Sequence, residues 1–344
     1  MQLDKMMINV AVIGCGYWGP NLIRNFMACP QTNLVVVCDL DQERLERTLA
    51  PFASVRKTTD LHDILDDASI DAVAIATPVG THYSLAKAAL EKGKHVLLEK
   101  PLAASVSQGL ELVELAARNN LRLMCDHTFC YTGAVRKIKQ VIDAGELGEL
   151  LYFDSIRINL GLFQSDVNVI WDLATHDLAI VDFLFPEKPI QVSAHGVAHA
   201  GNSIENIAYV TLIYPGNFIA HFHVNWLSPV KIRKTIIGGS KKMIEWNDLV
   251  PAEKIKIYDK GIELNPAEQD QKSKLMVSYR SGDIHSPQVD GTEALLLVAQ
   301  EFADCITEGR PPLTDGLAAL RVLRVLEAAE RSIKADGANV RIEY

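Results

Sequence analysis

The sequence predicts an N-terminal α/β domain with a doubly wound parallel sheet, followed by a C-terminal α+β domain with a large, mainly antiparallel sheet. Its 344 residues suffice for about two domains of ~150 residues each. Residues 8–127 alternate strand and helix patterns, whereas extended runs dominate after about residue 186. These observations together predict domains of 1–127 and 128–344.

The composition is typical of a folded protein without a polyanionic partner. Apolar residues make up 48% of the chain, enough for a sizeable core. The net charge of -9 argues against nucleic acid, because phosphate backbones select basic surfaces. No run approaches the ~18 apolar residues of a membrane span, and MQLDKMMINVAVIG does not match a signal peptide. We therefore expect no membrane partner.

The cysteines show neither C-x-x-C pairs nor metal-like clusters. Several of the six lie in apolar strand-like runs, which is typical of buried free thiols in a reducing compartment. We therefore expect no metal site, and a soluble, cytoplasmic protein.

Five short apolar runs predict strands that are buried on both faces. They are INVAVI, LVVVCD, DAVAIATP, HVLLEKP and LRLMCD. Helix-like segments lie between them, at 41–50, 60–67, 81–92 and 105–119. This alternation predicts a parallel sheet, because parallel strands need a crossover that is usually a helix.

After about residue 130 the pattern changes. Helix patterns at 132–144 and 171–185 precede five extended runs: QVSAHGVAHA, NIAYVTLIYP, FIAHFHVNWLS, KIRKTIIGG and KKMIEWND. Sequential strands of this kind predict an antiparallel sheet, which two final helices follow at about 291–308 and 315–335. Few helices are left to cover the sheet, so we expect a homodimer or homotetramer joined through these strands.

The segment VAVIGCGYWGPNLIRNF holds Gly14, Gly16 and Gly19 with G-x-G-x-x-G spacing, between a strand and a helix. The three glycines permit the tight turn, the approach of a pyrophosphate and close helix–strand packing, respectively. Phosphates would lie at the helix N-terminus. A turn needed only for packing is the alternative, but the context predicts a Rossmann dinucleotide site.

Asp39 ends the next strand, 20 residues after Gly19. A carboxylate there bonds the adenosine ribose hydroxyls and repels a 2′-phosphate, which favours NAD over NADP. Arg44 or Arg47 could still reach such a phosphate, so NADP remains possible.

The segment HVLLEKPLA ends a buried strand in two opposite charges, which is costly unless they are paired or used. Ligands of doubly wound sheets gather at the carboxyl ends of strands. Four residues follow such ends and should surround the glycine crevice: Thr77, Pro78, Glu99 and Lys100. Pro101 restricts Lys100, and their peptide bond is a candidate for the cis form. A surface ion pair is the structural alternative.

The helix pattern of residues 169–185 places Asp172 and His176 four residues apart, on one face. Apolar residues at core spacing occupy a different face. The alternative is an N-cap role for Asp172 and a satisfied first-turn position for His176. Asp177 and Asp182 are expected to be solvated charges without a role.

Together these segments resemble the Gfo/Idh/MocA (glucose–fructose oxidoreductase/inositol dehydrogenase/rhizopine catabolism) family of NAD(P)-dependent oxidoreductases. The resemblance covers nearly the whole chain, in VAVIGCGYWG, AIATPVGTHYSLAKAALEKGKHVLLEKPLA, IDAGELGELLYF, the D-x-x-x-H of WDLATHD, and DGLAALRVLRVLEAAERSI. It implies that Lys100 lies beside the reactive nicotinamide carbon, with Asp172 and His176 projecting towards the same point. Many relatives have a glycine-rich stretch before the aspartate, where this chain has SDVNVIW.

On this basis we assign a cofactor site and a reaction. The residues expected at the cofactor are Gly14, Gly16, Tyr17, Trp18, Gly19, Asp39, Thr77, Pro78, His82, Glu99 and Lys100. His176 is the expected acid/base, since an unperturbed histidine with a pKa near ~6.5 exchanges protons at neutral pH. Lys100 is the expected donor to the substrate oxygen, and Asp172 orients His176 or holds a hydroxyl. The roles of Lys100 and His176 could be exchanged, because burial lowers lysine pKa values.

The substrate prediction rests on the same resemblance. GCGYWGPNLIRNF and RINLGLFQSDVNVIWDLATHDLAIVDFLF look most like the branch containing UDP-N-acetylglucosamine (or its uronic acid) 3-dehydrogenases. Asn159, Gln164 and Asn168 could read sugar hydroxyl and amide groups, together with Asp172 and His176. Lys231 and Arg233 could meet a diphosphate or lie on a solvated strand face.

We therefore expect a nucleotide-sugar 3-dehydrogenase or 3-ketoreductase. A free-sugar or inositol dehydrogenase is the alternative among enzymes, and a non-catalytic NAD-binding sensor is the alternative from another class. The intact lysine, aspartate and histidine count against the sensor.

Overall fold

The computed structural model describes residues 7–161, 167–199, 201, 203–264 and 277–344, and the structural statements below concern these residues. They form two compact units: unit 1 comprises Met1–Thr132 and Thr292–Glu327, and unit 2 comprises Gly133–Gly291 and Ala328–Tyr344. The expected division follows chain order, whereas the units do not. A late segment, with α8 (Ala294–Glu308) and the start of α9 (Gly316–Lys334), packs in unit 1.

Unit 1 is built on a six-stranded parallel sheet of order β3-β2-β1-β4-β5-β6, which confirms the predicted doubly wound sheet. Its chain order reverses at β1, so the carboxyl ends of β1 and β4 flank the switch point where such sheets bind ligands. The strands are β1 Ile8–Ile13, β2 Thr32–Cys38, β3 Arg56–Thr58, β4 Ala72–Ile75, β5 His95–Glu99 and β6 Leu123–Asp126.

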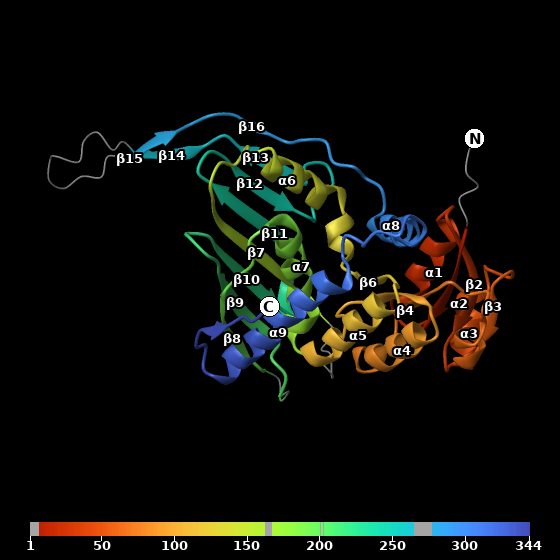
Figure 1. Cartoon of the computed structure of the whole chain (residues 1–344). Helices are drawn as coiled ribbons and strands as arrows, with labels where there is room; N and C mark the ends of the chain where they lie inside the picture. The colour runs from red at the N-terminus through yellow and green to blue at the C-terminus, as the bar shows by residue number, and fades with distance from the viewer. Residues whose placement is uncertain (1–6, 162–166, 200, 202, 265–276) are drawn as a thin grey trace. The chain divides into compact units, whose positions relative to one another are not determined.

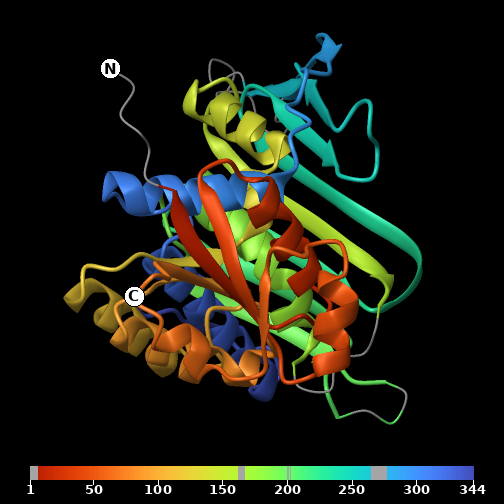
Figure 2. The same cartoon turned by 90° about the vertical axis from the view of Figure 1, so that its right-hand side faces the viewer.

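Helices cover both faces of this sheet (Figures 1 and 2). α1 buries Leu22, Ile23 and Phe26 and packs against α8, while α4 packs against α5. Asp41 caps α2 by accepting a hydrogen bond from the Arg44 N–H. The helices are α1 Gly19–Ala28, α2 Gln42–Leu49, α3 His62–Leu65, α4 Val79–Glu91, α5 Val106–Arg118 and the 3₁₀ helix η1 Thr128–Tyr131.

Unit 2 is built on a nine-stranded sheet of order β16-β13-β12-β11-β7-β10-β9-β8-β17. β7 and β10 pair in parallel, and the other pairings described for this sheet are antiparallel, as predicted. A separate pair joins β14 (Gly261–Leu264) to β15 (Val277–Arg280). The strands of the large sheet are β7 Leu150–Leu160, β8 Gln191–Val197, β9 Ile207–Ile213, β10 Ile219–Asn225, β11 Leu227–Gly239, β12 Met243–Asn247, β13 Ile255–Tyr258, β16 Ile284–His285 and β17 Val340–Arg341.

The two faces of the large sheet differ in burial. Unit 2 contains α6 (Gly133–Asp143), η2 (Ile170–Ala174) and α7 (Thr175–Leu184), together with the end of α9 from Ala328 onward. Alternate strand residues such as Phe153 and Phe222 are fully buried. Their neighbours on the other face, which we call the open face, include exposed apolar side chains: Ile156, Leu160, Val197, Tyr209 and Ile219.

Among the helices that the structure describes, none combines the length and the apolar character that crossing a bilayer requires. The six cysteines (Cys15, Cys29, Cys38, Cys125, Cys130 and Cys305) are buried free thiols, as expected.

Two buried carboxyl groups lie next to each other at the carboxyl ends of β5 and β6. Glu99 and Asp126 are register partners, and they are only 8% and 1% exposed. Burial and the neighbouring Asp126 carboxylate raise the pKa of Glu99 well above its usual range. Burial also raises the pKa of Asp126 to about 6, although the Thr128 hydroxyl donates to its Oδ1 at 2.7 Å. Burial and mutual repulsion therefore disfavour two negative charges in this pair.

The raised pKa of Asp126 predicts a pH-dependent stability. Because it lies above the unfolded value of ~3.9, the carboxyl contributes stability below about pH 4 that is lost as the pH rises through about 6. Asp126→Asn keeps an oxygen for Thr128 and removes the titration. Its melting temperature relative to wild type should therefore be several degrees higher at pH 8 than at pH 4. An unchanged difference, measured calorimetrically at both pH values, would contradict this account.

Candidate functional site

The turn between β1 and α1 needs two of its three motif glycines for its own packing. Gly14 has φ +100°, and a Cβ there would lie 2.7 Å from the Ala76 carbonyl oxygen. A Cβ on Gly19 would lie 2.1 Å from the carbonyl oxygen of Gly14. The chain itself therefore excludes side chains at both positions.

At Gly16, by contrast, no contact within the described chain excludes a side chain. A Cβ there would meet no atom within 4 Å, and the residue is exposed. The missing side chain leaves the backbone open just before α1, whose first N–H groups lack helical partners. Tyr17 and Trp18 follow, 82% and 44% exposed, with their rings edge to face at 5.6 Å. An open backbone before a helix N-terminus fits the pyrophosphate of a dinucleotide.

Asp39 lies immediately after β2 and is held against the glycine turn. Its Oδ2 accepts a hydrogen bond from the Cys15 N–H at 2.6 Å, and its Oδ1 accepts from the Asp41 N–H at 2.9 Å. The Arg44 guanidinium lies 3.3 Å from Oδ1. A carboxylate has about four acceptor positions, so these bonds fix Asp39 without using its whole capacity. This geometry fits a carboxylate that accepts hydrogen bonds from ribose hydroxyls.

His82 joins the ends of β4 and β5. Its Nδ1 lies 2.8 Å from the Pro101 carbonyl oxygen, its Nε2 lies 2.8 Å from that of Thr77, and the residue is 1% exposed. Burial lowers its pKa, and a neutral ring carries one N–H and so donates to one of the two carbonyls at a time. His82 thus fastens the loops that begin at Thr77–Pro78 and Lys100. Its expected contact with the cofactor remains a prediction.

The charged strand end that the sequence singles out is reproduced in detail. Lys100 is half-buried, directly after buried Glu99, and its peptide bond to Pro101 is cis, as expected. Lys100 therefore directly follows the buried acid pair at the carboxyl end of β5.

In unit 2 the expected helix over 171–185 is divided into the π-helix η2 and α7. The Thr175 hydroxyl donates to the Trp171 carbonyl oxygen near the junction. π-Helical turns are rare and frequently mark functional sites. Asp172 lies within η2 and His176 is the second residue of α7, both partly exposed. The pair thus lies across the junction instead of on one regular helix.

Asn168 supports the start of this helix. Its Oδ1 accepts hydrogen bonds from the N–H groups of Ile170 and Trp171, and its Nδ2 donates to Glu205 at 3.1 Å. Three hydrogen bonds use most of the capacity of this 8% exposed amide. Its proposed contact with a sugar stays a prediction, as does that of half-buried Asn159, and Gln164 lies outside the described residues.

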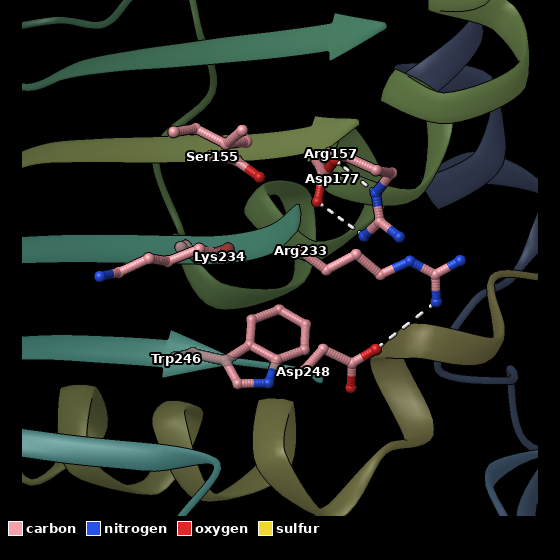
Figure 3. A pocket seen from close by; sticks show the side chains of 9 residues that line it. Ser155, Arg157, Asp177, Arg233, Lys234, Trp246 and Asp248 are labelled. Carbon is pink, nitrogen blue, oxygen red and sulfur yellow. Dashed lines mark hydrogen bonds and ion pairs between the residues drawn. The ribbon is translucent and has the colours of Figure 1, made fainter. Parts of the chain in front are cut away.

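Asp177 is not the solvated charge that we expect from the sequence. It is 1% exposed, and the Arg157 guanidinium donates to both of its oxygens, from Nε at 2.8 Å and from Nη2 at 2.9 Å (Figure 3). The expectation is wrong because Asp177 faces the sheet, where a charge persists only with a bidentate partner. Asp182 is likewise paired, with Lys188 at 2.9 Å. The sequence does carry a signal for this pair: Arg157 occupies a buried position of β7, and a buried arginine requires an acidic partner.

A hollow adjoins this ion pair (Figure 3). Arg233 is the register partner of Arg157 and lies 3.6 Å from Asp248. Burial and the neighbouring Arg157 lower the pKa of Arg233, so it does not lie on a freely solvated strand face. Its contact with a diphosphate, like that of Lys231, remains a prediction. The lining residues are Ser155, Ile156, Arg157, Asp177, Arg233, Lys234, Thr235, Trp246 and Asp248.

Sequence reasoning also misses Trp226, whose indole Nε1 donates to Asp172 Oδ2 at 3.0 Å. Lys100 belongs to unit 1, whereas Asp172 and His176 belong to unit 2, so their convergence stays a prediction. Within the described ranges, no group of three or more histidine, cysteine or acidic side chains could hold a metal ion.

Comparison with known proteins identifies relatives of the chain. Inositol 2-dehydrogenase 2 of Saccharopolyspora erythraea is 30% identical over 200 residues, which span 57% of this chain and 59% of that protein. A UDP-N-acetylglucosamine 3-dehydrogenase structure from Acidithiobacillus ferrooxidans is 24% identical with a TM-score of 0.81, covering 96% of this chain and 99% of that one. The WlbA dehydrogenase of Bordetella pertussis, solved with NADH and UDP-GlcNAcA, is 19% identical with a TM-score of 0.82, covering 99% of each chain. At these identities the two structures establish a shared fold.

Two domain models of one family match consecutive parts of the chain. Residues 8–127 match the model described as an oxidoreductase family with an NAD-binding Rossmann fold. Residues 135–245 match the model described as the GFO/IDH/MocA C-terminal domain. The NAD-binding Rossmann domain predicted from the glycine motif is thereby confirmed. The chain belongs to the Gfo/Idh/MocA family of oxidoreductases, the family that its sequence motifs resemble.

Proposed function

We propose that the protein transfers a hydride between NAD and a secondary alcohol or ketone of a sugar, as a nucleotide-sugar 3-dehydrogenase or 3-ketoreductase. The observation that carries the proposal is the intact set of Lys100 after β5 and Asp172 and His176 at the η2–α7 junction. Structural neighbours named for UDP-N-acetylglucosamine or solved with UDP-GlcNAcA support the sugar-nucleotide class.

The chain's own residues handle the proton and the charge of this reaction. The bound nicotinamide supplies the hydride acceptor or donor. In the oxidative direction His176 takes the proton from the substrate hydroxyl. Lys100 donates a hydrogen bond to the same oxygen as negative charge develops on it. Asp172 orients His176 or accepts a bond from a neighbouring substrate hydroxyl. In the reductive direction the same groups return the proton.

An inositol or free-sugar dehydrogenase is the second candidate, because relatives of the chain are named inositol 2-dehydrogenases. A panel of UDP- and dTDP-sugars, inositols and free sugars, assayed in both directions by nicotinamide absorbance, separates the two. We expect the highest turnover with a sugar nucleotide. Higher turnover with an inositol would replace the first candidate by the second, and no turnover at all would favour a sensor.

The proposed chemistry predicts the effects of removing each group. His176→Ala should lower turnover by ~10²–10⁴-fold, because the proton shuttle is lost. Lys100→Ala or Lys100→Met should lower it by ~10²–10³-fold, because a donor to the developing charge is lost. Since both act on one transition state, the double variant should lose less than the product of the two factors. Steady-state kinetics on the panel substrate measures all four.

Exposed His62 on α3 provides the matched control, and His62→Ala should keep full turnover. NADH fluorescence must show that every variant still binds the dinucleotide. Wild-type turnover of His176→Ala would contradict the acid/base assignment and leave His176 as a structural residue in the first turn of α7.

Asp39 supports a preference for NAD over NADP, which we include in the proposal. Asp39→Ala should weaken NAD binding by roughly ten- to a hundredfold, because a hydrogen bond to a charged group is worth ~1.5–3 kcal/mol. Asp39→Asn keeps an oxygen for the Cys15 N–H and so separates loss of charge from loss of the turn. Calorimetry that found tighter binding of NADP than of NAD by the wild type would contradict this assignment.

We further propose that two copies of the chain pair through the open face, as a homodimer or within a homotetramer. The exposed side chains of Ile156, Tyr209 and Ile219 would be removed from water there, and the family resemblance implies pairing through this sheet. Light scattering at micromolar concentration should give at least twice the 38.0 kDa of one chain. A mass near 38.0 kDa would rule the assembly out.

The buried thiols also support a location in the reducing cytoplasm, which we include in the proposal.

A further inference from the structure

Trp226 occupies an unusual place for so large a side chain. It is the single residue between β10, which ends at Asn225, and β11, which begins at Leu227. Residues between strands usually lie at the surface, yet Trp226 is 1% exposed and is among the largest fully buried side chains. Packing alone accounts for a buried ring, but it does not account for the direction of its one N–H group.

The backbone of Trp226 is fixed on both sides. Its N–H donates to the Asn206 carbonyl oxygen at 2.9 Å, and its own carbonyl accepts from the Gly161 N–H at 3.0 Å. Both partners follow or precede strands of the same sheet, and Asn206 is fully buried. The segment therefore has little freedom to rotate the indole.

Gly161 makes room for the ring itself. A Cβ on Gly161 would lie 2.8 Å from Trp226 Cδ1 and 3.2 Å from its Cγ. These are rigid ring atoms, so a side chain at 161 would displace the indole. The glycine is thus matched to the position that Trp226 takes.

The indole Nε1 is aimed at the candidate site. It donates to Asp172 Oδ2 at 3.0 Å, a normal hydrogen bond to a carboxylate. The Asp172 N–H in turn donates to the Asn168 carbonyl oxygen at 3.1 Å, which fixes its backbone. An indole offers a single donor and no acceptor, whereas a carboxylate offers about four acceptor positions. The bond therefore orients the carboxylate while leaving it capacity for His176 or a substrate hydroxyl.

We propose that Trp226 is a positioning residue that sets the orientation of the Asp172 carboxylate through its indole N–H, in a seat that Gly161 keeps open. This inference rests on the proposed function, because it acts through Asp172. Phenylalanine would fill most of the same space without the donor. The indole N–H is therefore needed to orient Asp172, whereas the packing of the core needs only an aromatic ring.

A double-variant cycle tests the proposal with UDP-N-acetylglucosamine and NAD, or with the best substrate of the panel. Trp226→Phe should lower kcat by roughly 10- to 100-fold, the effect of losing one hydrogen bond to a charged group. NAD affinity should stay within about twofold. In an Asp172→Ala background, which removes both carboxylate oxygens, the same change should alter kcat by less than about twofold, because the acceptor of the indole N–H is already absent. An equal factor in both backgrounds would mean a structural role only and would overturn the proposal.

Two further variants keep the test sound if Trp226→Phe folds poorly. Gly161→Ala displaces the indole and should reproduce the loss of kcat, again only when Asp172 is present. Phe222→Leu is the matched control, because Phe222 is a fully buried aromatic side chain on β10, the strand that directly precedes Trp226. It should lower the melting temperature to a similar extent and leave kcat unchanged.

A readout without turnover separates this inference from the proposed function. In ¹H–¹⁵N spectra, Asp172→Ala should shift the Trp226 indole resonance, identified by its absence in Trp226→Phe, and leave those of Trp18 and Trp246 in place. Full kcat of Trp226→Phe beside a lowered kcat of Asp172→Ala would overturn the inference and leave the proposed function standing. Full kcat of Asp172→Ala would instead remove Asp172 from the proposed function, while the indole shift would still report the contact.

Discussion

The buried ion pair of Arg157 and Asp177 ties the helix that carries His176 to the central strand of the large sheet. Both charges are almost fully excluded from water, and two parallel hydrogen bonds of 2.8 and 2.9 Å compensate for their desolvation. Removing one partner of such a pair typically costs about 3–5 kcal/mol, because the other charge is left buried and uncompensated. Asp177 directly follows His176, so the pair also limits how far α7 can slide along or rotate on β7. The role that we propose for His176 therefore depends on an ion pair that belongs to the core of unit 2.

The carboxylates of this protein differ in role because their surroundings differ. Asp39 accepts two backbone N–H groups next to the glycine turn and keeps acceptor capacity for the ribose hydroxyls that we propose it binds. Asp177 is neutralised by a guanidinium and serves the fold. Glu99 lies beside Asp126 in a desolvated pair, and burial raises the pKa of both carboxyl groups. Two negative charges are therefore disfavoured at this strand end, directly before Lys100.

Much of this arrangement is predictable from sequence, and the exceptions have physical reasons. Local rules suffice for the parallel sheet, the glycine turn and the cis Lys100–Pro101 bond, because strand alternation, spacing and proline act over a few residues. Helix periodicity does not reveal the π-turn before Thr175, since five residues are too few to change the period of the apolar pattern. The roles of Asp177 and Trp226 depend on partners 20 and 54 residues away, which only strand register and tertiary packing bring together. Contacts of this kind leave no periodic signal in a single sequence.

The two units thus prepare their functional groups by different means. Unit 1 uses backbone geometry: an open glycine and a fixed carboxylate lie at the ends of its parallel strands, where we propose that the dinucleotide binds. Unit 2 uses buried polar side chains, with Arg157, Asn168 and Trp226 each contacting a different part of the η2–α7 segment. Backbone sites suit a cofactor common to a whole family, because they need few particular side chains. Side-chain networks suit a substrate-binding region that differs between enzymes. A single substitution there can change the orientation of one group while the sheet stays the same.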